Sequence, residues 1–336
     1  MGKSSSLTIR NVIMSIQPDP ILGGMRSDEA TRIVLRFLLQ VMMVNEENLE
    51  KDLDTEVLHD YRVALRRTRS ALSQMKRVFP REIVRRFRKD LSSVGKISNR
   101  LRDLDVYLLN EDSFRKMLPA SLRDDIDPLF DHMRRKRSRI FREVIRRGKS
   151  RRYRKLFQEW DEFLRKPGTD FPTAPDAALP IRDVAQRRIR KKYERVLREG
   201  KRVLEDPKGE GLHLLRIECK ELRYLLEFFS GLFPRRKVRV LIGQLKKLQD
   251  LLGSYNDLSV QEQYLLDAAR ELRKTGRQSK KTPLAIGKLV KILNREKLTL
   301  KGAFAETFAE YSSPANRKFF RAIFPSGMLT AGASRR

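Results

Sequence analysis

The chain has 336 residues, with 74 lysines and arginines against 43 aspartates and glutamates, which gives a formal net charge of +31. Its hydrophobic content of 40% is enough for a packed core, which excludes a disordered basic tail. The single cysteine, Cys219, excludes an intrachain disulfide, and no apolar run approaches the ~20 residues of a membrane helix. Such a charge attracts polyanions, so the partner classes to weigh are nucleic acid, polyphosphate and anionic membrane surfaces.

Helical periodicity dominates the chain and no alternating strand pattern is convincing, so the predicted fold class is all-α. In chain order, helices of a first half, 1–165, are predicted at about 28–49, 57–78, 81–100, 102–117 and 122–165. A linker with four prolines follows at 166–180. Helices of a second half, 181–325, are predicted at about 181–205, 211–231, 235–252, 256–274 and 283–310.

The connections between these helices are short, which implies antiparallel neighbours, so each half is expected to form an up-and-down bundle. Pro80 and Pro234 are placed at helix starts, where proline is tolerated. A loop is predicted at 273–283, and the two ends, 1–25 and 326–336, are expected to be loosely ordered.

An internal repeat relates the two halves. When the sequence is shifted by 154 residues, segment 59–106 falls on 213–260 without a gap, and 13 of the 48 positions are identical. Helical sequences share composition, so some identities are accidental. An ungapped register that keeps a histidine, three basic positions and an aspartate is much harder to reach by chance. The second half is therefore predicted to repeat the first.

The repeated helix has two faces when successive residues are placed about 100° apart. One face is mostly apolar and predicts the core side: Tyr61, Ala64, Leu65, Thr68, Leu72, Met75 and Phe79 in the first copy, and Leu215, Cys219, Leu222, Leu226, Phe229 and Phe233 in the second. The adjacent side is basic: His59, Arg62, Arg66, Arg69 and Lys76 in the first copy, and His213, Arg216, Lys220 and Arg223 in the second.

Spacings of three and four residues place these like charges beside one another, which costs a few tenths of a kcal/mol per pair. An anion lying along the helix would offset that cost, and arginine presents a planar fork that matches phosphate oxygens two at a time. The competing interpretation is a solvated face with some arginines paired to carboxylates. The repeat and the net charge favour the anion-binding interpretation.

Asp103 and Asp257 occupy equivalent positions in the two copies. They are expected either to orient basic side chains or to cap the start of a helix. His59 and His213 open the basic edge of each copy, and a nearby polyanion would favour their protonated form. They either contact phosphate directly or cap the helix.

Further basic side chains follow helical spacing elsewhere. These residues are Arg135, Arg139, Arg142 and Arg146 in the first half, and Arg187, Arg188, Lys191 and Arg195 in the second. They either enlarge the binding surface or keep the protein soluble, and for any one of them solubility is the simpler explanation.

No catalytic pattern is convincing. His59-Asp60 resembles the dipeptide of metal phosphohydrolases, but those enzymes need a histidine upstream, and the other histidines, His132 and His213, follow it. The chain has too few cysteines and histidines for a metal site built from these residues. Cys219 is predicted on the core side of its helix, which disfavours it as a nucleophile. We therefore expect no enzyme activity, no cofactor and no metal.

The segment HDYRVALRRTR at 59–69, followed by RDLDV at 102–106, and HLLRIECKELRY at 213–224, followed by NDL at 256–258, resemble the CHAD domain, the histidine-bearing α-helical domain. The resemblance covers roughly 28–312. It implies two four-helix bundles related by a pseudo-twofold axis, which bind inorganic polyphosphate at a basic surface or pore between them.

By matching positions, the resemblance assigns binding to the histidine, arginine and lysine positions of the two basic edges. The second copy departs from the first at Glu218 and Glu221, where the first has Ala64 and Arg67. This difference puts an equal contribution of the two halves in doubt.

Polyphosphate binding is thus the leading functional hypothesis, with a cytoplasmic location and association with polyphosphate granules. The alternative is a sequence-nonspecific nucleic-acid-binding protein that contacts the phosphate backbone. Single-strand binders usually interleave aromatic residues for base stacking, whereas Phe79, Phe229 and Phe233 lie on the predicted core face. An enzyme of phosphate metabolism is disfavoured by the missing acid and metal signatures.

Overall fold

The protein is helical, without β-strands, over the residues that a computed structural model describes: 20–49, 55–167, 174–206, 209–276 and 279–326. This confirms the all-α fold class. The predicted disorder of the two ends lies largely outside the described residues, as does segment 168–173 of the predicted linker.

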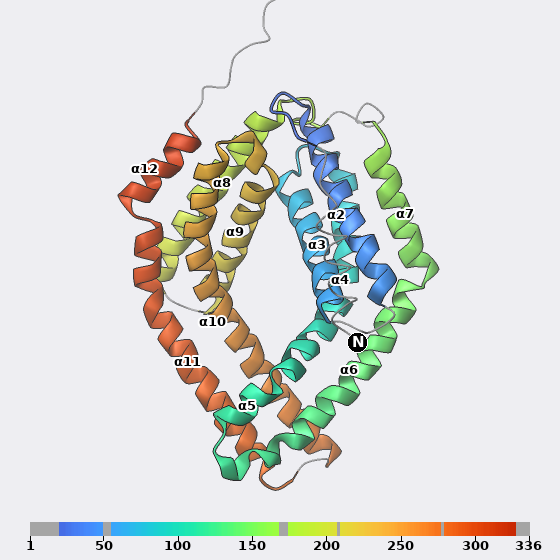
Figure 1. Ribbon diagram of the computed structural model, residues 1–336, viewed down its shortest axis with the longest axis vertical. Helices are drawn as coiled ribbons and strands as arrows, with labels where there is room; N and C mark the ends of the chain where they lie inside the picture. Colours follow the sequence, from blue (N-terminus) through green and yellow to red (C-terminus); the bar gives the residue numbers. More distant parts are fainter. Residues whose placement is uncertain (1–19, 50–54, 168–173, 207–208, 277–278, 327–336) are drawn as a thin grey trace, which may run out of the picture. The chain divides into compact units, whose positions relative to one another are not determined.

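Figure 1 shows the helices in chain order. Their bounds are α2 Ser27–Leu49, α3 Thr55–Gln74, α4 Arg81–Leu109, α5 Glu111–Met117, α6 Asp127–Gly148, α7 Arg151–Arg165, α8 Ile181–Glu205, α9 Gly209–Phe228, α10 Arg235–Thr275, α11 Thr282–Tyr311 and α12 Pro314–Ile323. Short 3-10 turns lie at Ala120–Leu122, Asp124–Ile126 and Ser230–Leu232.

The helix starts keep the 154-residue register of the sequence repeat. α2 and α8 begin at 27 and 181, α3 and α9 at 55 and 209, and α4 and α10 at 81 and 235. Pro80 and Pro234 stand immediately before α4 and α10, as predicted. The starts of these three helix pairs therefore keep the repeat, whereas α5, shifted by the same number of residues, falls inside α10.

Several predicted boundaries are wrong. α4 continues without a break past residue 101, and α10 continues through 253–255. The predicted helix 122–165 is instead divided, because Ser150 accepts a hydrogen bond from the backbone N–H of Tyr153 and starts a new helix, α7. α3 ends at Gln74 rather than at residue 78. α12 is absent from the prediction, although Ser313 caps it and Pro314 opens it.

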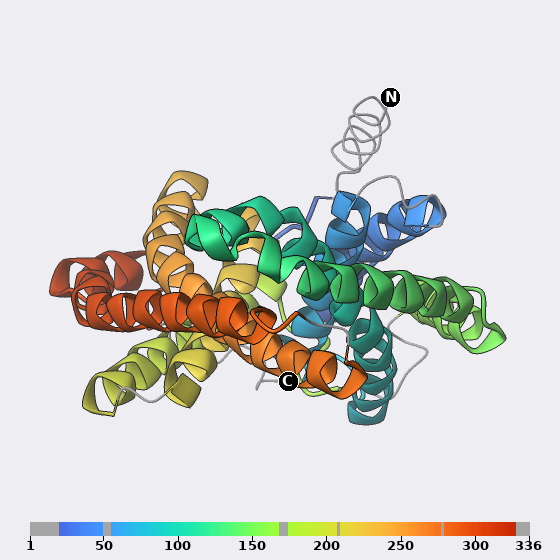
Figure 2. The same ribbon diagram turned by 90° about the horizontal axis from the view of Figure 1, so that it is seen from below.

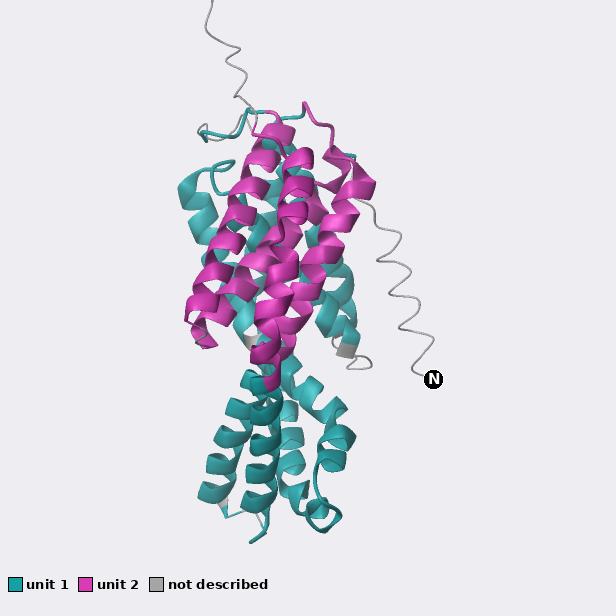
Figure 3. Cartoon of the chain, turned by 90° about the vertical axis from the view of Figure 1, so that its left-hand side faces the viewer, with its two compact units in different colours: residues 1–20, 25–179, 257–298 teal, residues 21–24, 180–256, 299–336 magenta. Residues whose placement is uncertain are grey.

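The chain forms two compact units, coloured separately in Figure 3. Unit 1 contains Met25–Leu179 and Asp257–Leu298, and unit 2 contains Ile21–Gly24, Pro180–Asn256 and the residues from Thr299 onwards. α10 and α11 each contribute to both units. The compact units therefore differ in extent from the two sequence halves, which are divided at the linker.

Unit 1 has one apolar region among α2, α3, α4 and α7, where the ring of Phe87 lies 4.5 Å from Trp160. The predicted core residues of α3 are all buried there. A second cluster joins the end of α4, α5, α6, the end of α10 and the start of α11. Its buried members include Leu104, Leu265 and Leu289. Figures 1 and 2 show these helix segments gathered together. Segments from both sequence halves thus share one core.

Unit 2 packs α8 against α9, and the predicted core residues of α9 are all buried. Tyr193 stacks on Phe320, with the ring centroids 3.7 Å apart. Gly200 of α8 faces Phe308, and a Cβ at this position would lie only 2.0 Å from the ring. Only glycine allows this close approach of the α8 backbone to the Phe308 ring.

Candidate functional site

The basic edge of the first copy lies on α3, in unit 1. Arg66 is exposed, whereas His59, Arg62 and Arg69 are half-buried. Lys76 is exposed but lies beyond the end of α3, in the turn that leads to α4. The buried core residues of α3 orient the helix, so its basic residues are presented on the adjacent side.

α4 supplies polar partners to this edge, because consecutive helices joined by a short turn run antiparallel. The guanidinium of Arg62 donates from Nε and Nη2 to Oδ1 of Asn99, at 3.1 and 2.8 Å. Asp103 also lies near Arg62, and each favours the charged form of the other. Asp103 is in the interior of α4, so the alternative that it caps a helix is wrong.

The cations of this region repel one another. Burial lowers the pKa of His59, and Arg102 and Arg66 lower it further, partly offset by Glu56 and Asp60. Burial, Arg66 and Arg102 lower the pKa of Arg62 to about 10, even though Asp103 and Asp105 act in the opposite direction.

Arg69 continues this pattern at the other end of the edge. Burial lowers the pKa of Arg69, and Arg88 of α4 lowers it further. Within the described residues, Arg69 forms no ion pair with a carboxylate. We define the α3–α4 basic cluster as His59, Arg62, Arg66, Arg69, Arg88 and Arg102. It gathers one histidine and five arginines on two neighbouring helices, with Arg102 paired to Glu56 at 3.3 Å.

The basic edge of the second copy lies on α9, in unit 2, and its residues also have polar partners. Nε of Arg223 donates to Oε1 of Glu227 at 2.6 Å, and Nη1 of Arg223 donates to Oε1 of Gln249 at 3.3 Å. Nδ1 of His213 lies 2.8 Å from Oδ1 of Asn256, and the ring nitrogen is the donor because an amide oxygen can only accept. The other two members, Arg216 and Lys220, are half-buried.

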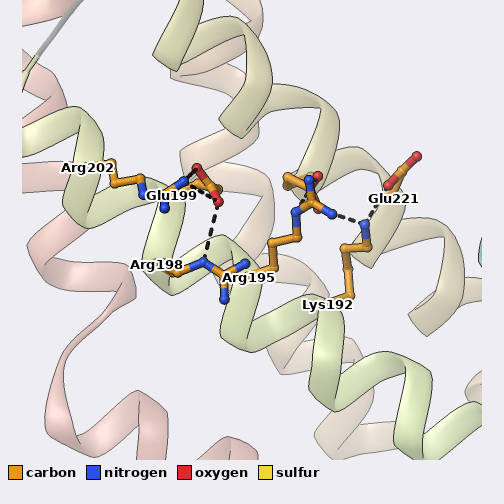
Figure 4. Close-up of polar contacts among 7 residues, drawn as sticks. Lys192, Arg195, Arg198, Glu199, Arg202 and Glu221 are labelled. Carbon is orange, nitrogen blue, oxygen red and sulfur yellow. Dashed lines mark hydrogen bonds and ion pairs between the residues drawn. The ribbon is translucent and has the colours of Figure 1, made fainter.

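Glu218 and Glu221, which distinguish the second copy from the first, are held by α8. Nζ of Lys192 lies 2.6 Å from each carboxylate, and Nε of Arg195 lies 2.9 Å from Glu218. Figure 4 shows Lys192 paired with Glu221. These two acids thus have basic partners on α8.

Asp257 lies in the interior of α10, so the capping alternative is wrong for it as well. Asp103 and Asp257 are both in unit 1 and lie close enough for Asp257 to raise the pKa of Asp103. Burial is the larger cause of that shift, and Arg62 opposes it. The structure therefore brings the two repeat-related aspartates near each other.

Most of the additional basic residues predicted from helical spacing lie on exposed faces: Arg135, Arg139, Arg142 and Arg146 on α6, and Arg187, Lys191 and Arg195 on α8. Arg188 of α8 is instead half-buried. The sequence analysis missed Asn99, Arg88 and Arg102 as neighbours of the α3 edge. Their signal is the hairpin of α3 and α4, because antiparallel neighbouring helices bring residues before the turn near residues after it.

A cavity of about 800 Å³ lies elsewhere in unit 1, between α4, α7 and the end of α6. Its lining includes Tyr61 and Tyr153, whose hydroxyl oxygens are 2.7 Å apart, and Tyr153 donates to Glu46 at 2.9 Å. No member of the α3–α4 basic cluster lines it. An extended polyanion would bind an open surface, so the candidate site does not depend on this cavity.

The described residues contain no group of three or more histidine, cysteine, aspartate or glutamate side chains placed to hold a metal ion. Cys219 is buried, and burial raises the pKa of its thiol, which makes it a poor nucleophile. No helix within the described ranges is long and apolar enough to span a membrane.

The fold and the site define an all-helical, strongly basic protein with repeated cationic helix edges. The CHAD domain family matches residues 33–266, and the chain belongs to this family. No curated protein sequence matches the chain.

Two solved structures share the fold. The crystal structure of the CHAD domain from the plant Ricinus communis is 22% identical, covers 93% of this chain and 96% of its own, and has a TM-score of 0.66. PptA from Streptomyces chartreusis is 16% identical, covers 84% of this chain and 99% of its own, and has a TM-score of 0.65.

Proposed function

We propose that the chain binds inorganic polyphosphate through the basic edges of α3 and α9, as two four-helix bundles related by a pseudo-twofold axis. The CHAD family is known for polyphosphate binding in general. The observation that carries the proposal is the gathering of one histidine and five arginines in the α3–α4 basic cluster, where like charges repel one another. Burial is the main cause of the lowered pKa of His59, Arg62 and Arg69, and neighbouring arginines lower it further. A phosphoryl chain along this edge would relieve that repulsion.

The chemistry of the cluster fits a chain of phosphoryl groups. Arginines at positions 62, 66 and 69 lie on successive turns of α3, and each guanidinium can meet two oxygens of one phosphate. Asn99 and Asp103 hold Arg62 in place, which reduces the entropy lost when it binds. The predicted role of Asp103 is therefore to orient Arg62.

Nucleic acid is the second candidate, because its backbone presents the same phosphate chemistry. Aromatic residues available for base stacking are few at the repeated motif: Phe79, Phe229 and Phe233 are buried in the core. Their burial favours a ligand without bases.

The experiment is a competition at physiological ionic strength between long polyphosphate and DNA of equal total charge. Polyphosphate is expected to displace DNA, and the proposal fails if DNA wins. Salt dependence alone cannot decide, because both ligands release counterions. Charge reversal of Arg62, Arg66, Arg216 and Arg223 should abolish binding while the helical circular dichroism spectrum is retained.

Binding rather than catalysis is part of the proposal, and it is supported by the burial and raised pKa of the Cys219 thiol. Such binding would place the protein on polyphosphate granules in the cytoplasm. Incubation with long polyphosphate should release no orthophosphate and leave the chain length unchanged on a gel.

A further inference from the structure

A row of four arginines runs along one exposed face of α6 in unit 1. Arg135, Arg139, Arg142 and Arg146 are spaced by four, three and four residues and are all exposed. On a regular helix this spacing keeps them within about 60° around the axis and spreads them over about 16 Å along it. We call these four side chains the α6 arginine row.

The carboxylates near α6 are used by its other arginines. Arg134 binds Asp131 at 2.9 Å, Arg137 binds the buried Asp105 at 2.7 Å, and Arg147 binds Glu143 at 2.7 Å. Within the described ranges, no carboxylate lies at ion-pair distance from a member of the α6 arginine row. Neighbouring like charges on a helix are destabilising, so an anion along this face would stabilise α6.

The composition of this face defines the chemistry of its partner. α6 contributes no large exposed hydrophobic side chain, so a partner held by apolar contact does not fit. Ser138 lies beside the row, and the remaining contacts available are guanidinium forks, which match phosphate oxygens. Because the charges stand in single file rather than over a broad surface, they fit a linear chain of phosphoryl groups.

The α6 arginine row and the α3–α4 basic cluster belong to the same unit. Arg137 reaches Asp105 of α4 from the opposite side of α6, so the row faces away from α4 and only a long chain could reach both surfaces. We propose that the α6 arginine row is a second binding track for inorganic polyphosphate, occupied by chains long enough to extend beyond the α3–α4 basic cluster. This inference rests on the proposed function. It adds a dependence on chain length that the α3 edge alone does not predict.

The test compares two variants of the full chain that each lose four positive charges. The first carries Arg135→Gln, Arg139→Gln, Arg142→Gln and Arg146→Gln. The control carries Arg134→Gln, Arg147→Gln, Arg165→Gln and Arg270→Gln, whose arginines are also exposed and in unit 1 but are paired with carboxylates. Tripolyphosphate serves as the short probe and polyphosphate of many tens of residues as the long one.

For the long probe, removal of the α6 arginine row should lower the affinity at least tenfold below that of the control. The slope of log affinity against log salt should decrease in magnitude by about 3, because each of the four lost contacts contributes about 0.7. Tripolyphosphate affinity should remain equal in the two variants. Circular dichroism should show wild-type helicity, since the substituted side chains are exposed.

The inference is overturned if the long probe binds both variants equally, or if tripolyphosphate affinity falls together with that of the long chain. It is also overturned if the row variant loses only single-stranded DNA, because the row would then serve nucleic acid. If the wild-type protein binds neither polyphosphate probe, the proposed function itself fails and the second track fails with it.

Discussion

The basic edge of the second copy has an ion pair that one substitution could introduce into the first copy. Arg223 is paired with Glu227 four residues later, whereas the equivalent Arg69 is followed by Ser73. Replacing Ser73→Glu should transfer this pairing to the first copy. A new carboxylate would then compete with phosphate for the Arg69 guanidinium, and it would also repel the polyanion.

The expected magnitude follows from the loss of one charge-assisted phosphate contact. Such a contact is worth about 1.5–3 kcal/mol, which corresponds to roughly a tenfold to hundredfold loss of affinity. The salt slope should decrease by about 0.7 for one fewer phosphate contact. Folding should hardly change, because an exposed helical ion pair four residues apart contributes only about 0.3–0.5 kcal/mol.

The reciprocal variant, Glu227→Ser, should strengthen polyphosphate binding because it releases Arg223. Glu310→Ser is the matched control: it removes a carboxylate from unit 2 that pairs with Lys247, outside the motif. Fluorescence titration with long polyphosphate at several salt concentrations measures both quantities. The reasoning is refuted if Ser73→Glu binds as the wild type does, or if Glu227→Ser binds no more tightly than the control.

Three further results are expected. Burial and Arg102 lower the pKa of His59 below 6.5 in the free protein, and a bound polyanion should raise it. Binding should then take up a proton, so affinity for polyphosphate increases as pH falls from 7 to 5, and titration at each pH should show a smaller increase in His59→Gln. Gly200→Ala should destabilise unit 2 by about 1–3 kcal/mol in urea unfolding, because its Cβ overlaps the Phe308 ring, whereas Gly243→Ala, at which a Cβ meets nothing within 4 Å, should not destabilise. Lys192→Leu should lower the free energy of unfolding by about 3 kcal/mol, because it removes the ion-pair partner of the buried Glu218 carboxylate. Adding Glu218→Ala should recover much of this loss, since the equivalent residues in the first copy are Leu38 and Ala64. Equal stability of the single and double variants would contradict this reasoning.

Much of the fold follows from periodicity in the sequence. The starts of α4 and α10 are marked by Pro80 and Pro234, and the core faces of α3 and α9 are buried as predicted. The continuity of α4 is not visible in the same way, because Asp103 suggests a helix start when α4 is considered alone. In the folded chain its carboxylate lies near Arg62 of α3, which makes an interior position favourable.

The basic residues of the site can be predicted from spacing on one helix, but their partners cannot. Asn99 holds Arg62 and Gln249 holds Arg223 from the next helix along the chain, so the helix pairing must be known first. Lys192 likewise reaches Glu218 from α8. Such contacts decide which cations remain available to a ligand.

The apolar cluster shared by α4, α6, α10 and α11 also determines how the chain can be divided. A fragment that ends or begins at the linker would carry either Leu104 and Phe130 or Leu265 and Leu289. Each pair would lack the apolar residues of the other half, against which it packs. Such a fragment would expose this surface to water and tend to aggregate when expressed alone. Production of the two fragments in the same cell should instead allow them to reassemble through this cluster.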